Sequence, residues 1–346
     1  MVFVVEGSIA LLASVVAPYL GDAVINEITF VGSLLIVGIS LNLLGHHQTA
    51  DPEHGSRHSA ADPAVPFYIN NHSIIQGGLL MTYGFIGTGN MGGALARAAA
   101  KTVEVRSCIV LANRTPEKAA KLADEIGASV ADNLTVAREC DYILLGVKPQ
   151  MMAGMLAEIA PVLRQRTTPF VLLSMAAGLT VARIREIAGG DYPVIRIMPN
   201  TAVAVGEGVT LYCCSDNVTD AQREGFISLL HCSGLLEELD EKLIDAGSAV
   251  AGCSGAFAYL FLEALADGGV YAGLPRAKAQ RYAAQMLLGA AKLALESDDH
   301  TAALKDAVCS PGGTTIAGVR ALEEHGFRAA AIDAVLAAYD RTKALQ

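Results

Sequence analysis

The sequence predicts an α/β domain with a ligand site at one sheet edge, followed by an all-helical domain and preceded by an extra apolar segment. Between residues 83 and 198, short apolar runs alternate with alanine-rich stretches, which is typical of a parallel sheet covered by helices. From about Leu243 the apolar residues recur at helical spacing. The predicted divisions are 1–45, an apolar segment; 46–80, a linker; 81–242, the α/β domain; and 243–346, the helical domain.

Each expected strand ends in glycine or polar residues. The strands are 83–86, 108–112, 141–147, 170–174 and 194–198. The first leads directly into Gly87-Thr88-Gly89-Asn90-Met91-Gly92, a Gly-x-Gly-x-x-Gly pattern. Gly87 permits a sharp turn, Gly89 lets a pyrophosphate approach the backbone, and Gly92 lets helix and strand pack closely. A strand, this turn and a helix in succession predict a Rossmann-type dinucleotide-binding domain.

The second strand ends in Asn113-Arg114-Thr115, where the adenosine ribose is expected. An Asp or Glu at this place usually holds a ribose without a 2′-phosphate, and none is present here. A guanidinium and hydroxyls suit a 2′-phosphate instead, so NADP(H) is favoured over NAD(H). The alternative is that Arg114 is an exposed residue at a helix start.

Three further strand ends should face the same crevice, because carboxyl ends of parallel strands share one sheet edge. They are Val147-Lys148-Pro149, Met175-Ala176-Ala177-Gly178 and Pro199-Asn200-Thr201. The small side chains of the second leave room for the nicotinamide ribose.

A second glycine-containing turn lies far along the chain, in Cys309-Ser310-Pro311-Gly312-Gly313-Thr314-Thr315. Its glycines allow successive N–H groups to aim at one point, and the following helix start adds partial positive charge. The segment therefore predicts a pocket for a small anion such as a carboxylate, ringed by hydroxyls. The alternative is an ordinary helix cap after a turn.

With these motifs in place, the chain from about Met81 resembles the pyrroline-5-carboxylate reductase family. The resemblance rests on the glycine pattern at 84–96, on Val147-Lys148-Pro149, on Arg196-Ile197-Met198-Pro199-Asn200-Thr201 and on the segment from Leu304 to Thr315. It implies a Rossmann domain, a helical dimerisation domain, and reduction of 1-pyrroline-5-carboxylate to proline by NADPH, with NADH as a possible substitute.

The resemblance also implies roles for individual residues. The cofactor residues are Gly87, Thr88, Gly89, Asn90, Met91, Gly92, Asn113, Arg114, Thr115, Asn133, Val147, Lys148, Pro149, Ala176, Ala177 and Asn200. The residues that bind the substrate carboxylate are Ser310, Gly312, Gly313, Thr314 and Thr315, and Ser310 and Thr315 are the catalytic candidates. The family often has proline where Gly255 stands, which predicts a looser helix start here.

Two other functions stay open at this point. One is a related NADP-dependent imine or β-hydroxyacid reductase; the latter usually depends on a lysine in the helical domain, and no lysine here lies in a comparable glycine-rich setting. The other is a non-catalytic, membrane-tethered protein that binds a dinucleotide.

Composition restricts partners and compartment. The chain has 346 residues and a formal net charge of −10, which argues against nucleic acid and anionic membrane surfaces. Seven cysteines without a C-x-x-C pattern fit reduced thiols in a cytoplasmic protein, and no metal site is expected. Wide apolar faces on the expected helices favour a homodimer or higher homo-oligomer. These helices are 256–272, 276–296, 302–308, 315–324 and 328–345.

The first eighty residues differ from the rest. Ile28 to Gly45 is an uncharged run just long enough to span a membrane, and 26–45 resembles the end of a small bacterial multi-span membrane protein family of unknown function. Any membrane contact is expected only through 1–45. In the linker, His54 and His58 more plausibly lie in solvent than bind a metal. We hypothesise that two neighbouring genes became one reading frame, with the reductase beginning at Met81.

Overall fold

The computed structural model describes residues 75–76, 79–104 and 106–344. The chain divides into two units, Met1–Ile69 and Asn70–Gln346, and all described residues belong to the second. The apolar segment 1–45, its predicted membrane contact, and His54 and His58 therefore lie outside the described residues. The last part of the predicted linker contains two short antiparallel strands, β1 (Ile75–Gln76) and β2 (Leu79–Leu80).

An eight-stranded sheet forms the α/β domain, and its spatial order is β10-β9-β8-β7-β6-β3-β4-β5. All five predicted strands are confirmed, within three residues at each end. The strands are β3 (Tyr83–Ile86), β4 (Ile109–Ala112), β5 (Ser129–Val130), β6 (Tyr142–Leu145), β7 (Val171–Ser174), β8 (Val194–Pro199), β9 (Gly208–Cys214) and β10 (Gly234–Glu238). Parallel pairing from β5 to β8 brings the carboxyl ends of the predicted strands to one edge.

The sheet is not parallel throughout, because β9 runs antiparallel to β8. Only a short 3₁₀ turn, Thr201–Val205, and a few flanking residues connect these two strands. A parallel connection needs a crossover of a dozen or more residues, so the short link forces reversal of direction. β10 then pairs parallel to β9 after the helix α8 (Asp220–Leu230).

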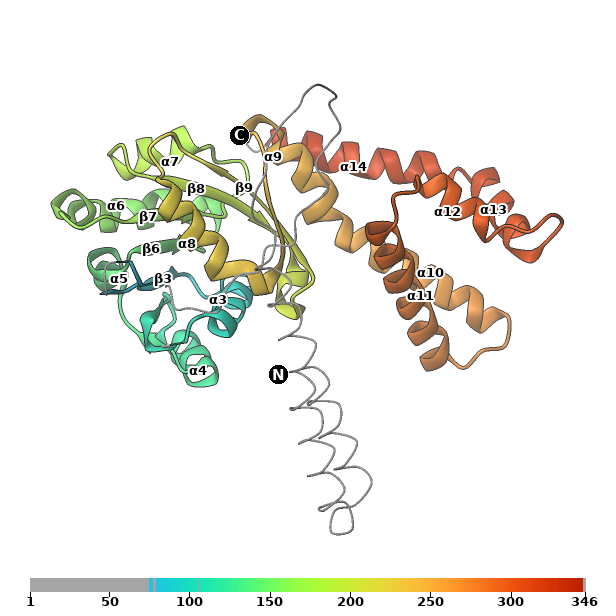
Figure 1. Ribbon diagram of the computed structural model, residues 1–346, viewed down its shortest axis with the longest axis horizontal. Coiled ribbons are helices and arrows are strands. Elements are labelled where there is room, and N and C mark those ends of the chain that lie inside the picture. Colours follow the sequence, from blue (N-terminus) through green and yellow to red (C-terminus); the bar gives the residue numbers. More distant parts are fainter. Residues whose placement is uncertain (1–74, 77–78, 105, 345–346) are drawn as a thin grey trace, which may run out of the picture. The chain divides into compact units, whose positions relative to one another are not determined.

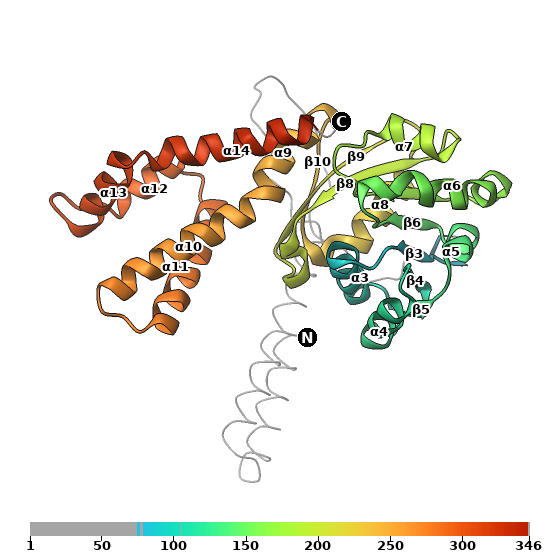
Figure 2. The ribbon, with the colours of Figure 1, turned by 180° about the vertical axis from the view of Figure 1, so that it is seen from behind.

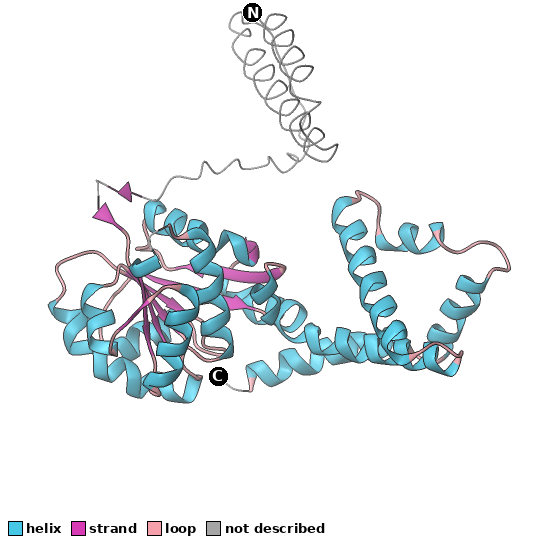
Figure 3. Cartoon of the chain, turned by 90° about the horizontal axis from the view of Figure 1, so that it is seen from below, coloured by secondary structure: helices cyan, strands magenta, loops and turns pink. Residues whose placement is uncertain are grey.

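Helices cover both faces of this sheet, as Figures 2 and 3 show. They are α3 (Asn90–Thr102), α4 (Pro116–Ile126), α5 (Asn133–Glu139), α6 (Pro149–Gln165), α7 (Val181–Ala188) and α8. Two apolar cores result, one beneath α3, α4 and α8 and the other beneath α5, α6 and α7. Every residue of β3, β6 and β7 is buried, which explains their near-continuous apolar sequences.

The helical domain begins with one uninterrupted helical segment, Glu241–Tyr271. It consists of α9 (Glu241–Ser248), a π-helical turn η5 (Ala249–Cys253) and α10 (Ser254–Tyr271). The predicted helix start at Gly255 is therefore wrong, since the backbone on both sides is already helical. The remaining helices are α11 (Arg276–Glu296), α12 (Thr301–Ala307), α13 (Thr314–Glu324) and α14 (Phe327–Lys343), which confirm the predicted helices (Figure 1).

This helical domain buries very little of its own apolar surface. In the described part of α10 to α14, only Ala266, Ala279 and Ala283 are buried. Large apolar side chains such as Leu260 and Tyr271 are 68% and 97% exposed. Glu241–Tyr271 is also the one described helix that is long and apolar enough to cross a membrane, with a mean hydropathy of 1.6.

Candidate functional site

The glycine turn between β3 and α3 has the shape that the sequence predicts. Gly87 has a φ of +99°, which side-chain-bearing residues rarely adopt. A Cβ atom on Gly92 would overlap the carbonyl oxygen of Gly87, so close contact of helix and strand requires glycine there. In contrast, a Cβ on Gly89 would meet no protein atom within 4 Å, so the space beside Gly89 is open to a ligand.

Gly146, directly after β6, completes this turn and was not among the predicted site residues. A Cβ on Gly146 would also overlap the carbonyl oxygen of Gly87, and the Gly146 N–H donates to the carbonyl of Ile86 at 2.7 Å. The sequence signal was a glycine at the end of a buried strand, which indicates close approach of two backbones.

The start of α3 offers unpaired N–H groups to an anion. Gly89 is the N-cap residue and supplies no side chain, and the first turn contains no acidic residue. The first N–H groups of a helix have no partner within the helix, and the helix dipole favours negative charge there. The turn and helix start thus fit a dinucleotide pyrophosphate.

Asn113 connects the two cofactor segments. Its Oδ1 accepts a hydrogen bond from the backbone N–H of Thr88 at 3.2 Å, and its Nδ2 donates to the carbonyl of Thr115 at 3.0 Å. Arg114 beside it is exposed and, among the described residues, has no ion pair or side-chain hydrogen bond. Thr115 is the N-cap of α4 but makes no side-chain capping bond. Arg114 and Thr115 therefore present free donors at the end of β4.

The other predicted cofactor residues lie at the carboxyl edge of the sheet or next to it. Parallel register aligns Ile86 with Leu145, and Leu145 with Ser174, so the segments that follow these strands start at one level. Val147 is half-buried and Lys148 exposed; Pro149 is the first residue of α6. Ala176 is buried and Ala177 exposed; Asn133 begins α5 and donates to Glu158 at 3.0 Å.

Both polar atoms of the Asn200 side chain, like those of Asn113, make hydrogen bonds within the protein. Its Oδ1 accepts from the N–H groups of Ala202 and Val209, each at 3.2 Å. Its Nδ2 donates to the carbonyl of Ala251 in η5 at 3.0 Å. The side chain thus connects the end of β8 to β9 and to η5.

The second glycine turn, Ser310–Gly313, is a type II turn that opens α13. The N–H of Gly313 donates to the carbonyl of Ser310 at 3.0 Å, Pro311 occupies the second position and Gly312 has a φ of +68°. A Cβ on Gly313 would overlap the Ser310 hydroxyl oxygen, so a larger residue there would displace this hydroxyl. No side chain caps α13, and Thr314 and Thr315 are exposed at its first turn. The N–H groups and hydroxyls at this helix start can hold a carboxylate.

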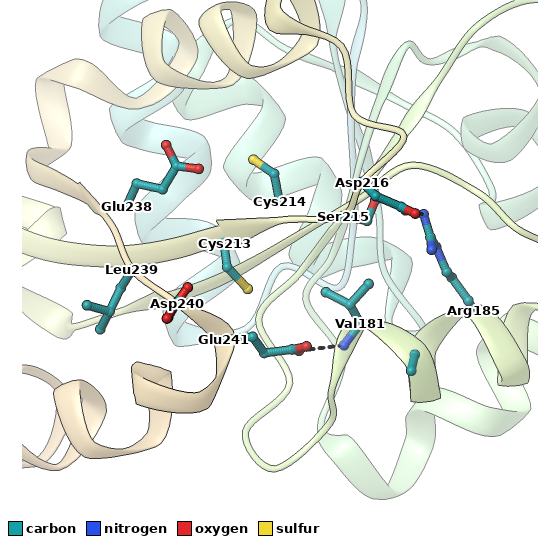
Figure 4. A pocket seen from close by; sticks show the side chains of 11 residues that line it. Val181, Arg185, Cys213, Cys214, Ser215, Asp216, Glu238, Leu239, Asp240 and Glu241 are labelled. Atoms are coloured by element: carbon teal, nitrogen blue, oxygen red, sulfur yellow. Dashed lines mark hydrogen bonds and ion pairs between the residues drawn. The ribbon is translucent and has the colours of Figure 1, made fainter.

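A pocket of about 580 Å³ lies elsewhere, beside the last residues of β9 and β10 (Figure 4). Register pairs Cys214 with Ile195 near the start of β8, away from the carboxyl edge. None of the predicted site residues lines it, and burial raises the pKa of its Cys213 thiol to about 12. A thiol with that pKa stays protonated at neutral pH, which supports packing rather than redox chemistry.

An α/β sheet with a glycine-rich turn, joined to helices of which one starts uncapped at a second glycine turn, has the architecture of a dinucleotide-dependent oxidoreductase. Residues 82–178 match a family described as NADP oxidoreductase coenzyme F420-dependent, and residues 241–345 match pyrroline-5-carboxylate reductase dimerisation. The chain belongs to the pyrroline-5-carboxylate reductase family.

Curated relatives and solved structures support this membership. The pyrroline-5-carboxylate reductases of Escherichia coli K12 and Pisum sativum are 39% and 40% identical over 264 and 266 residues; these alignments cover 76% of this chain and 97% and 96% of the relatives. The structure of Plasmodium falciparum pyrroline carboxylate reductase with NADP bound has a TM-score of 0.69 at 31% identity, covering 76% of this chain and 97% of that one.

The N-terminal segment has a separate relationship. Residues 1–50 match a family described as protein of unknown function (DUF554), which confirms the predicted resemblance to a family of unknown function. The reductases from Escherichia coli and Pisum sativum each leave about a quarter of this chain uncovered. The two parts of the chain thus have different relatives.

Proposed function

We propose that this protein reduces 1-pyrroline-5-carboxylate to L-proline with NADPH. The observation that carries the proposal is the pair of glycine turns, each ending at an uncapped helix start, in a member of this reductase family. One turn fits a pyrophosphate and the other fits the carboxylate of a small substrate.

The residues of the Ser310–Gly313 turn and α13 bind and orient the substrate. The N–H groups of Thr314 and Thr315 and the Ser310 hydroxyl hold the carboxylate, and the Thr315 hydroxyl lies at the ring nitrogen. The Gly313 N–H, which was also predicted for this role, instead closes the turn by donating to the Ser310 carbonyl at 3.0 Å. When bound, NADPH supplies a hydride to the C=N carbon. The cyclic imine is already electrophilic once protonated, so positioning contributes most of the rate.

No general acid–base pair is required by this chemistry. The Thr315 hydroxyl polarises or helps to protonate the imine nitrogen, and we assign it at most about 10²-fold in rate, the lower end for general acid catalysis. The NADPH site fits the turn geometry, because the space beside Gly89 is open and Arg114 is available for a 2′-phosphate.

We further propose that the working form is a cytoplasmic homodimer or a larger assembly of dimers. The exposed apolar side chains of α10, α11 and α14 would be covered by the same helices of a second copy. The apolar segment Glu241–Tyr271 is then an interface helix, since it lies within the residues that match the family's dimerisation model.

The decisive test is steady-state turnover of 1-pyrroline-5-carboxylate with NADPH and with NADH. Absence of turnover with either cofactor would end the proposal and favour a non-catalytic dinucleotide-binding protein. Faster turnover of a hydroxyacid than of the cyclic imine would instead favour a β-hydroxyacid dehydrogenase.

Two variants test the assigned residues. Thr315→Ala should lower kcat by up to about 10²-fold, whereas Thr301→Ala, at the exposed first turn of α12, should leave it unchanged. Arg114→Ala should raise KM for NADPH about tenfold or more with little effect on NADH, since one charged contact is worth roughly 1.5–3 kcal/mol. Equal losses with both cofactors would show that Arg114 does not bind a 2′-phosphate.

A further inference from the structure

Two side chains, one within β8 and one directly after its last residue, contact a single continuous helical segment. Arg196 Nη2 donates to Asp245 Oδ1 on α9 at 2.7 Å, and Asn200 Nδ2 donates to the Ala251 carbonyl in η5 at 3.0 Å. Arg196 precedes Asn200 along the chain, and its partner Asp245 likewise precedes Ala251. The segment α9–η5 therefore follows the direction of β8.

Arg196 is an unusual residue for the centre of a sheet. Its side chain is 1% exposed, its partner Asp245 is 5% exposed, and its Nε finds no hydrogen-bond partner among the described residues. A buried ion pair with an unsatisfied donor is a poor way to gain stability, because apolar residues of similar volume often do as well or better. Such a pair does, however, fix the arrangement of β8 and α9 relative to each other.

The same ion pair extends to the other helices. Lys343 Nζ on α14 lies 3.8 Å from the second carboxylate oxygen of Asp245. α14 packs against α9 and η5, and α13, which begins at the Ser310–Gly313 turn, packs against α14. A continuous series of contacts thus runs from β8 to the helix that opens at the substrate turn.

Glu241, the first residue of α9, extends the contacts in the opposite direction. Its Oε1 lies 3.6 Å from Arg196 Nη1 and accepts a hydrogen bond at 2.7 Å from the N–H of Val181, the first residue of α7 (Figure 4). Val181 follows the segment Ala176–Gly178 that is predicted to line the nicotinamide ribose. A Cβ on Gly247 would overlap the Leu211 side chain, so α9 packs closely against β9.

We propose that Arg196 is a positioning residue. Together with Asn200 it fixes α9–η5 on the sheet, and so keeps the nicotinamide end of the cofactor site and the substrate-binding helices in a fixed relative position. The inference rests on the proposed function, since this relative position matters for hydride transfer. Disturbing Arg196 should lower kcat while leaving the affinity for NADPH almost unchanged, because the glycine turn 87–92 and Arg114 are remote from it in the sheet order.

The test is a double variant, Arg196→Met with Asp245→Leu, which replaces the buried ion pair with apolar side chains. We expect Tm to stay within a few degrees of the unmodified protein, as buried apolar replacements often allow. At the same time kcat should fall at least about tenfold, the equivalent of roughly 1.4 kcal/mol, with KM for NADPH changed less than about twofold. The single variant Arg196→Lys keeps the positive charge, so its kcat should lie between those of the double variant and the unmodified protein.

The matched control is Arg185→Met, which removes another largely buried arginine of the same domain, paired with Asp191 and Asp216 near the start of β8. It should lower Tm and leave kcat unchanged. A double variant with full kcat, or with KM for NADPH raised as much as kcat falls, would overturn the proposal.

Hydrogen exchange of residues 245–253 supplies a readout independent of turnover. These amides should exchange at least about tenfold faster in the double variant than in the unmodified protein, and unchanged exchange would also overturn the proposal. If the unmodified protein does not turn over the imine, the proposed function fails while the exchange result still judges the role of Arg196. If the double variant does not fold, Arg196→Lys is measured in the same three ways, with the same outcomes counting against the proposal.

Discussion

The two domains of this protein differ in how far each completes its own structure. In the α/β domain, whole strands such as β6 and β7 are buried, and two apolar cores enclose the sheet. In α12, α13 and α14 no described residue is buried. The α/β domain therefore buries its apolar side chains within the chain, whereas the helical domain leaves apolar surface that a second copy would cover. An exposed apolar side chain is therefore an ordinary surface residue in the α/β domain but a candidate interface residue in the helical domain.

The largest expected effect comes from charging the exposed face of the helical domain. Leu260 on α10 is 68% exposed, and Leu260→Lys would place an unpaired cation in the expected interface. We expect the dissociation constant of the oligomer to rise by roughly 10² or more, the equivalent of about 2.7 kcal/mol. Sedimentation velocity at several protein concentrations measures this.

Val130→Lys is the matched control, because Val130 is a 47% exposed apolar residue on β5 in the α/β domain. It should leave the assembly unchanged. If the oligomers of both variants dissociate, or if neither does, the exposed apolar side chains of the helical domain do not form the interface.

A smaller effect separates two glycines of the same turn. Gly89→Ala should leave Tm within about 1 °C, since nothing in the protein meets the added methyl group, yet raise KM for NADPH about tenfold by occupying the pyrophosphate space. Gly92→Ala should raise KM and also cost about 1–3 kcal/mol of stability through overlap with Gly87. Thermal melts with and without NADPH distinguish the two, and a destabilised Gly89→Ala would contradict the assignment.

The smallest effect concerns alkaline unfolding. Burial, and then the nearby Asp141 carboxylate, raise the pKa of Tyr83 from 10.0 to about 12. The neutral phenol is thus favoured in the folded state: its contribution to stability is complete below about pH 10 and is lost as pH rises from 10 through 12. Tyr83→Phe should shift the alkaline midpoint upward by a few tenths of a pH unit.

The chain has no tryptophan, so tyrosinate absorbance reports the titration directly. A downward shift for Tyr83→Phe would contradict the assignment.

Much of the fold could be predicted because local patterns coincide with the final structure. The helices predicted from apolar periodicity end within two residues of those observed, and the glycine turn 87–92 has the predicted geometry. β9 was missed because β8 and β9 are joined by a turn too short to be recognised as a reversal among polar and small residues. Gly255 was misread because a π turn inside a continuous helix has no cap that a sequence pattern displays.

The candidate site shows the same division between local and distant contacts. Gly312 could be predicted because a Pro-Gly pair specifies a type II turn by itself. The use of Asn200 could not, because its partners Val209 and Ala251 are brought to it only by the folded sheet and by α9–η5. Arg196 had been noted only as part of a motif, and its partner Asp245 is distant in sequence.

The position of β3 in the sheet has a consequence for what can be joined to this enzyme. β3 lies between β6 and β4, with Gly87 at its carboxyl end, and its first residues are secured by Thr82, whose N–H and hydroxyl both donate to Asp141 Oδ2 at 2.8 and 2.9 Å. The nucleotide turn therefore lies at the opposite end of β3 from Thr82 and Met81. Since the contacts of Thr82 are made within the α/β domain, we expect a version that starts at Met81 to turn over as fast as the full chain.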